Sequence, residues 1–346
     1  MRYDTQKLTA FAAAVGEKAG LNPEDSILFA KSLVQADMRG VSSHGVTRLK
    51  AYVRRLTEGV MDPAAVPVIT DDGGSILRVD AGNGVGMVTA HKIMETCIAR
   101  ARETGSCFAA VTGGNHFGYA AYFTQQAADA GMIGLASANS IAAMAPMGGK
   151  TPLLGTNPLS IAVPAGKYRP LVLDMATSVV ARGKVTLAAK EGKEIPLGWG
   201  IDANGAPTTD PTKVATVLPF GGAKGYGISL IITILSSCLS GALADKDVGS
   251  MYNVSRPQNN GFFLGAVDIT RVIPREIFLA SVDALFDSVK GCEKADGVQE
   301  IYIPGEIEYN RAERAAKEGI SISDAVAKEL TELSEQFGVP FDCTAE

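Results

Sequence analysis

The feature that most constrains the fold of this chain is an alternation of strand-like and helix-like segments between residues 65 and 175. Short runs rich in β-forming residues occur at 75–79, 107–111, 133–138 and 171–173. Ala-rich stretches with helical character lie between them, at 86–104 and 120–131. Strands that alternate with helices of this length are typical of a sheet covered by helices. The sequence therefore predicts an α/β fold for the middle of the chain.

The first sixty residues have a different pattern, in which apolar side chains recur at helical spacing. Leu8, Phe11 and Val15 lie three and four residues apart, as on one face of a helix. Asn22 followed by Pro23 is a typical helix start, with Asn22 as the N-cap. We expect a third helix from Ser43 through Leu56 that ends near residue 59.

The second half of the chain predicts further elements. Residues 218–242 indicate a glycine turn followed by an apolar helix, residues 259–268 and 277–281 indicate strands, and residues 309–336 are charged and helical. We therefore expect three parts. Residues 1–70 form a helical part that packs with a helical part at 300–346, and residues 71–299 form the α/β part.

Composition and charge exclude several classes of protein. The 346 residues have a formal net charge of -5 and no basic block, which argues against a nucleic-acid surface. The five cysteines are widely spaced, with no CxxC, so neither a disulfide framework nor a metal cluster is expected. The longest apolar run, about 228–235, is too short to span a membrane, and the first residues do not resemble a signal peptide. We expect a cytoplasmic protein with no metal and no membrane partner.

One polar motif lies in the predicted third helix. His44, Arg48 and Tyr52 follow at four-residue steps, so a helix would place them on one stripe. A guanidinium can bind a carboxylate through two parallel hydrogen bonds, and an imidazole can exchange a proton. The alternative is an ordinary polar helix face with Ser43 as a cap. Gly45 is unfavourable inside a helix, which indicates that a glycine is needed at this position for another reason.

A second histidine follows a predicted strand. His116 lies in Gly-Gly-Asn-His-Phe-Gly at 113–118, before an Ala-rich stretch. We expect His116 near a helix N-terminus, where the helix field keeps the imidazole neutral and able to accept a hydroxyl proton. The alternative is a turn histidine bonded to the backbone. His91, within an amphipathic helix, is interpreted as structural.

Several glycine turns carry groups that can bind phosphate. Residues 146–149, 154–159 and 173–178 combine glycines with Thr, Asn and Ser, and Asp174 ends a strand, where it can accept from a ribose hydroxyl or cap a helix. Lys224 opens an apolar helix from a glycine-rich turn, without Walker spacing. Since no GxGxxG follows a strand, the usual Rossmann fingerprint is absent.

Taken together, these motifs resemble the type II malate/L-lactate dehydrogenase family. The resemblance covers nearly the whole chain, in the order of the family. It rests on RGVSSHGVTRLKAY, GGNHFGYAAYF, PMGGKTPLLGTNPLSIAVP, LDMATSVVARGKV, IPLGWGIDANGAPTTDP, GGAKGYGISLIITILSSCLSGA and IYIPGEIE. It implies a non-Rossmann α/β fold with a mixed sheet and helical N- and C-terminal segments, assembled as a homodimer.

The resemblance also implies the site. Residues 71–299 would bind NAD, with NADP possible, and residues 1–70 would lie on the substrate side. His116 would be the acid or base, and His44 the second catalytic residue, although these two roles can be exchanged. Ser43, Arg48 and Tyr52 would bind substrate. The dinucleotide contacts would be Ser140, Asp174, Met175, Ala176, Lys224, Gly305, Glu306 and Ile307. The role of Arg182 is open.

The implied activity is hydride transfer between NAD(P) and a small 2-hydroxy or 2-oxo carboxylic acid of the malate or lactate type. NAD is favoured over NADP because a carboxylate such as Asp174 near the ribose repels a 2′-phosphate. Two alternatives stay open at this point. One is a reductase of cyclic imines, and the other is a dinucleotide-binding sensor without catalytic activity.

Overall fold

The computed structural model describes residues 1–70 and 73–345. The α-helices are α1 (Thr5–Lys18), α2 (Pro23–Met38), α3 (Leu49–Thr57), α4 (Gly86–Thr104), α5 (Ala121–Asp129), α6 (Arg182–Glu191), α7 (Ala223–Thr233), α8 (Arg275–Gly291), α9 (Glu306–Glu318) and α10 (Asp324–Phe337). The strands are β1 (Arg2–Tyr3), β2 (Val68–Thr70), β3 (Ile76–Asp80), β4 (Ser106–Gly114), β5 (Ile133–Ala138), β6 (Leu159–Val163), β7 (Leu171–Met175), β8 (Gly200–Ile201), β9 (Thr216–Val217), β10 (Asn260–Val267) and β11 (Ile320–Ser321).

A seven-stranded sheet forms the centre of the molecule, in the order β2-β3-β4-β10-β5-β6-β7. Strands β3 and β4 run parallel, and the other neighbouring pairs run antiparallel. The predicted mixed sheet is therefore confirmed. Strand β10 lies between β4 and β5, where Phe262 pairs with Val111 on one side and with Ala138 on the other. This insertion brings the end of β4 and the start of β10 to the same edge of the sheet.

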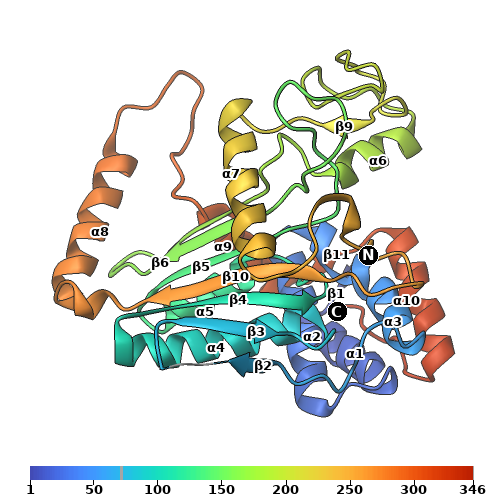
Figure 1. Cartoon of the computed structure of the whole chain (residues 1–346), viewed down its shortest axis with the longest axis horizontal. Coiled ribbons are helices and arrows are strands. Elements are labelled where there is room, and N and C mark those ends of the chain that lie inside the picture. Colours follow the sequence, from blue (N-terminus) through green and yellow to red (C-terminus); the bar gives the residue numbers. More distant parts are fainter. Residues whose placement is uncertain (71–72, 346) are drawn as a thin grey trace.

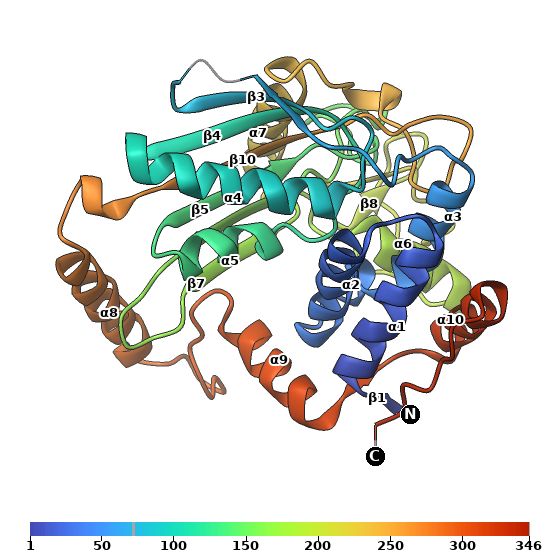
Figure 2. The ribbon, with the colours of Figure 1, turned by 90° about the horizontal axis from the view of Figure 1, so that it is seen from below.

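Helices cover both faces of the sheet (Figures 1 and 2). Helices α4 and α5 lie across one face, and α7 with the π-helical turn Ile234–Cys238 stands on the other. Small side chains allow the close approach of α4 to β4, because Ala109 is fully buried against the apolar face of the helix, which includes Ile93 and Cys97.

The two ends of the chain lie together, as Figure 1 shows. Strand β1 pairs with β11, and helices α1 and α3 contact α10 while α2 contacts α9. Asn22 caps α2 as expected, since its side chain accepts from the amide of Asp25, and Pro23 is the first helical residue. The predicted boundary at residues 70 and 71 borders Asp71 and Asp72, which lie outside the described residues, as does Glu346.

One predicted strand is wrong. Residues 277–281 lie inside α8, which Pro274 precedes. Leu279, Val282 and Phe286 are among its less exposed apolar side chains, and their spacing of three and four residues is that of a helix. A five-residue apolar window was too short to reveal this period. Strand β6 and helix α6 are additional elements that the sequence did not predict. Within the described ranges, no helix is both long enough and apolar enough to cross a membrane.

Candidate active site

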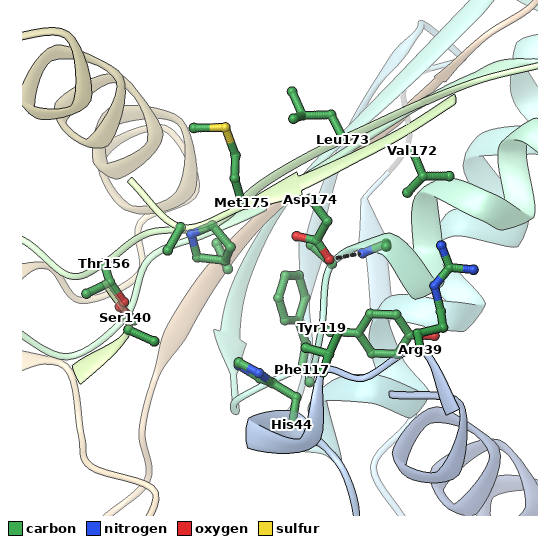
Figure 3. A pocket seen from close by; sticks show the side chains of 18 of the residues that line it. Arg39, His44, Phe117, Tyr119, Ser140, Thr156, Val172, Leu173, Asp174 and Met175 are labelled. Carbon is green, nitrogen blue, oxygen red and sulfur yellow. Dashed lines mark hydrogen bonds between the residues drawn. The ribbon is translucent and has the colours of Figure 1, made fainter. Parts of the chain in front are cut away.

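A cavity of about 490 Å³ opens beside the ends of β4, β7 and β10. Its wall includes His44, His116, Phe117, Tyr119, Ser140, Thr156, Asp174, Met175, Gly305 and Phe262. Figure 3 shows Arg39 and Asp174 on one side of this cavity, Ser140 and Thr156 on the other, and His44 projecting from the segment that follows α2. Residues from both ends of the chain and from the sheet therefore form one site.

Two histidine rings stack at this cavity. The rings of His44 and His116 are 5.4 Å apart between centroids, with 11° between their planes. Burial lowers the pKa of His44 to about 4, with a further contribution from the charge of Arg48. Burial also holds the pKa of His116 well below its usual value, with His44 and Arg48 acting in the same direction. Both rings are therefore neutral near pH 7.

The expected helix start at His116 is wrong. Strand β4 continues to Gly114, and α5 begins only at Ala121, so His116 lies in the loop between them. The low pKa of His116 comes mainly from burial, with His44 and Arg48 acting in the same direction, and α5 does not begin at this residue. The loop is held from two sides, because the His116 amide donates to Gln258 Oε1 at 3.1 Å and Gly86 leaves no room for a Cβ against the carbonyl of Asn115.

Tyr52 lies behind His116 and does not line the cavity. Its side chain is 1% exposed, and its hydroxyl meets His116 Nδ1 at 2.5 Å. The amide of Gly118 also points to this nitrogen, at 3.3 Å. A backbone N–H can only donate, so Nδ1 is an acceptor and the neutral ring carries its proton on Nε2. Tyr52 donates in that state, and burial raises the pKa of its hydroxyl.

The predicted helix from Ser43 to Leu56 is broken into three pieces. Residues Ser42–His44 and Val46–Arg48 form two 3-10 turns, and α3 begins only at Leu49. Gly45 between the turns is extended, with φ -85° and ψ -154°. The physical reason is Asp37 in α2, whose carboxylate accepts the Val46 amide at 2.7 Å and packs against Gly45.

Arg48 is close enough to both histidines to affect their pKa values, but it is not among the residues of the cavity wall. Its Nε donates to the carbonyl of Ser43 at 2.6 Å, and its guanidinium lies 5.5 Å from the ring centre of Tyr252. The Ser43 hydroxyl is 2.9 Å from His44 Nδ1. Ser43, His44 and Arg48 thus form one connected group, although no continuous helix carries them.

Asp174 both lines the cavity and caps a helix. Its Oδ2 accepts from the amide of Ala121 at 2.8 Å, at the start of α5 (Figure 3). Burial raises the pKa of Asp174 to about 6, opposed by this hydrogen bond and by the charge of Arg39. The helix that Asp174 caps precedes it in the chain, a relationship that the sequence alone does not reveal.

The other predicted cofactor residues divide into two groups. Ser140, Met175, Ala176 and Gly305 line the cavity together with Asp174. Lys224, Glu306 and Ile307 are not on its wall in the part of the chain that the structure describes. Lys224 and Ile307 are exposed, and Glu306 pairs with Lys290 at 2.8 Å and accepts from the Ile303 amide. Arg182 donates to the carbonyl of Val214.

The structure adds cavity residues that the sequence did not indicate as functional. Arg39 belongs to the first histidine motif, where its position before Gly40 gave no sign of a role. Asn260, at the start of β10, is 3% exposed, and its Oδ1 has no hydrogen-bond partner among the described residues. A buried amide oxygen on a cavity wall is suited to accept from a ligand amide, such as the carboxamide of a nicotinamide ring. Residues 1–70 and 73–345 include no cluster of metal-ligating side chains.

Comparisons with known proteins agree with this architecture. A family model described as malate/L-lactate dehydrogenase matches residues 3–331. A malate dehydrogenase from Pyrococcus horikoshii is 36% identical over 349 residues, covering 98% of this chain and 96% of that protein. An L-sulfolactate dehydrogenase from Methanocaldococcus jannaschii is 37% identical over 325 residues, 93% of each chain. The solved malate dehydrogenase from Entamoeba histolytica superposes with a TM-score of 0.94 at 28% identity, covering 99% of both chains.

The family requires a nicotinamide dinucleotide, and the chain has both a cavity and an unpaired buried acceptor that suit one. The family model extends over almost the entire sequence, and the two sequence relatives are 36% and 37% identical over 98% and 93% of this chain. The chain therefore belongs to the malate/L-lactate dehydrogenase family, and it is a nicotinamide-dependent dehydrogenase of small hydroxy acids.

Proposed function

We propose that the protein reversibly oxidises a small 2-hydroxy carboxylic acid of the malate or lactate type, with NAD as the hydride acceptor. The observation that carries this proposal is the environment of His116. Its ring lies on the cavity wall, stacked on His44, while Tyr52 and Gly118 engage Nδ1 from behind. Nε2 is therefore the ring nitrogen that a substrate oxygen meets.

Proton exchange at His116 follows from these contacts. In the resting ring, Nε2–H can donate to the oxygen of a 2-oxo acid, which favours binding of the ketone. For reduction, the ring first takes a second proton from solvent at Nδ1, and the imidazolium can then give its Nε2 proton to the developing alkoxide and keep the proton on Nδ1. A phenol hydroxyl both donates and accepts, so Tyr52 can bond Nδ1 in either state. In the oxidation direction, the ring starts with its proton on Nδ1, bonded to the Tyr52 oxygen, so that Nε2 is free to take the hydroxyl proton. The extra proton then returns to solvent.

The substrate carboxylate would be bound by Arg48. The contact of Arg48 Nε with the Ser43 carbonyl fixes one edge of the guanidinium beside His44. The remaining N–H groups of the planar guanidinium would bind a carboxylate through two hydrogen bonds, a geometry that a lysine cannot provide. With its carboxylate at Arg48, a 2-oxo acid would have its carbonyl near the two histidines.

The cofactor would lie in the cavity and supply hydride chemistry at C4 of its nicotinamide ring. We propose that Ser140, Asp174, Met175, Ala176 and Gly305 contact it, with Lys224, Glu306 and Ile307 at its outer parts. NAD is favoured over NADP because the Asp174 carboxylate on the cavity wall would repel a 2′-phosphate nearby.

We also propose that the active form is a homodimer. Helix α8 has one buried side chain, Phe286, and exposes Ile277 and Leu285 at 50% and 60%. On α7 and the turn after it, Ile231 and Leu239 are each 56% exposed. Apolar surfaces of this kind are typical of subunit interfaces. Light scattering on the purified protein tests the assembly, and a monomer at micromolar concentration would contradict it.

The activity is tested by following NADH consumption after addition of pyruvate, oxaloacetate and sulfopyruvate. Turnover of at least one of these acids is expected. Activity confined to a five- or six-membered cyclic imine carboxylate would favour the reductase instead. NADH fluorescence enhancement without turnover of any compound would favour a sensor. If the protein neither binds NADH nor turns over any of these compounds, the proposed function is contradicted altogether.

A further inference from the structure

Residues 249–258 form a closed loop beside the two histidines. The Gly249 amide donates to the carbonyl of Gln258 at 2.9 Å, and Gln258 Nε2 donates back to the carbonyl of Gly249 at 3.3 Å. The amide oxygen of Gln258 accepts from the backbone of His116. The base of the loop is therefore attached directly to the turn that holds His116.

The interior of this loop is held by the guanidinium of Arg55. This side chain, on α3, has no exposed surface. It donates to the carbonyls of Ser250 at 3.4 Å and Arg256 at 3.4 Å, and also to the carbonyl of Asn253. A fourth bond, of 3.2 Å, goes to Asn115 Oδ1, next to His116.

A fully buried arginine bound mainly to carbonyl oxygens is expensive, because a charge has left water. Burial lowers the pKa of Arg55, and no neighbouring carboxylate among the described residues offsets this shift. An apolar side chain of similar volume would avoid this cost but would leave the loop carbonyls unbonded. This argues that the role of Arg55 is to hold the loop in one conformation, and not simply to stabilise the fold.

An aromatic ring at the tip of the loop lies beside Arg48. Tyr252 is 63% exposed, which is unusual for a large aromatic side chain, and its ring lies against the guanidinium of Arg48. At the base of the loop, Gln258 is bonded to the backbone of His116, and at its tip Tyr252 contacts Arg48. A 2-oxo acid held between His116 and Arg48 would have its second substituent next to the Tyr252 ring.

We propose that Tyr252, held in place by Arg55, limits the size of the second substituent that the substrate can carry. Tyr252 forms a wall of the substrate site, and Arg55 is a positioning residue that acts through the loop. The inference rests on the proposed function, because the wall has meaning only if Arg48 and His116 hold a 2-oxo acid between them.

The experiment compares kcat/KM for pyruvate with kcat/KM for 2-oxo-4-methylpentanoate, which carries a branched substituent. Tyr252→Ala should raise the ratio of branched to small substrate by roughly tenfold, a typical effect of steric exclusion in a pocket. Tyr252→Phe is the matched control and should leave the ratio close to the wild-type value. Arg55→Lys, which cannot reach all four acceptors, should shift the ratio in the same direction.

The ratio separates a positioning role from a loss of folded protein, because a smaller active fraction lowers both rates equally. An unchanged ratio in Tyr252→Ala would overturn the proposal. A shift in Tyr252→Ala with none in Arg55→Lys would overturn the role of Arg55. If the wild type turns over neither acid, nor oxaloacetate nor sulfopyruvate, the proposed function and this inference both fail.

Discussion

The carboxylate of Asp37 occupies the position that a Cβ on Gly45 would take. Its Oδ2 also accepts from the amide of Val46, so the carboxylate fills the break between the two turns that carry His44 and Arg48. A side chain at position 45 and a carboxylate at position 37 exclude each other. The placement of both substrate-side residues therefore depends on a residue of another helix.

This relationship predicts a coupled pair of substitutions. Gly45→Ala should lower kcat/KM for the 2-oxo acid by roughly tenfold or more, mainly through KM, because the segment must move away from Asp37. Adding Asp37→Ala opens the occupied space, so the double variant should recover part of the loss. A double-mutant cycle measures this coupling. Gly291→Ala is the control, since a Cβ there meets open space. A double variant worse than the sum of its singles would contradict the steric argument.

The roles of the two histidines lead to a second prediction. His116→Ala should lower kcat by about 10²–10⁴, the usual cost of losing a general acid or base. His44→Ala should chiefly raise KM for the 2-oxo acid, since His44 would bind the substrate beside Ser43 and Arg48. Steady-state kinetics with saturating NADH separate these effects. The opposite outcome for the two variants would exchange their roles, and full turnover in both would place the chemistry elsewhere.

The sequence was most informative where a pattern is local. Asn22 and Pro23 start α2 as expected, and the β-rich run at 133–138 coincides with β5. The order of the strands in the sheet could not be predicted in this way, because β10 lies between β4 and β5 although it follows them by more than a hundred residues. No local propensity records such a pairing.

Contacts between distant segments explain the errors at the site. The helix through His44 was expected from spacing, but tertiary contact with Asp37 broke it. Tyr52 was expected on one helix stripe with His44 and Arg48, and its hydroxyl instead meets His116 Nδ1, at a separation of 64 residues. The buried charge of Arg55 likewise depends on a loop about 200 residues away in the chain. Spacing identified several residues of the site without their orientations.

The pKa of Asp37 predicts a pH dependence of stability. Burial raises the pKa of Asp37 to about 7, partly opposed by the Val46 amide. Between roughly pH 4 and pH 7, the unfolded chain has lost this proton while the folded chain keeps it. The contribution of Asp37 to the free energy of unfolding is therefore greatest at low pH and falls as the pH rises through this window.

The asparagine of Asp37→Asn cannot ionise. The Tm of this variant minus the Tm of the wild type should therefore increase from pH 5 to pH 8. Differential scanning calorimetry at several pH values measures the difference. Asp287→Asn is the matched control, because hydrogen bonds from Lys167 and Tyr168 lower the pKa of Asp287 and keep it ionised throughout this range. Its offset from the wild type should stay constant. A constant offset for Asp37→Asn as well would show that the folded Asp37 is already ionised at pH 5.

The charge of Asp174 leads to a prediction about the preference for NAD over NADP. With a pKa of about 6, its carboxylate is ionised at pH 7.5, where it would oppose a 2′-phosphate. Asp174→Asn removes this charge but keeps an oxygen that can accept from the Ala121 amide, so α5 stays capped. The ratio of kcat/KM for NADPH to that for NADH should therefore rise, with little change in Tm. Asp174→Ala should raise the ratio too, but it also removes the cap and should destabilise the fold by about 1 kcal/mol. An unchanged ratio in both variants would place Asp174 away from the adenosine ribose, and a wild type that prefers NADPH would reverse the assignment of NAD.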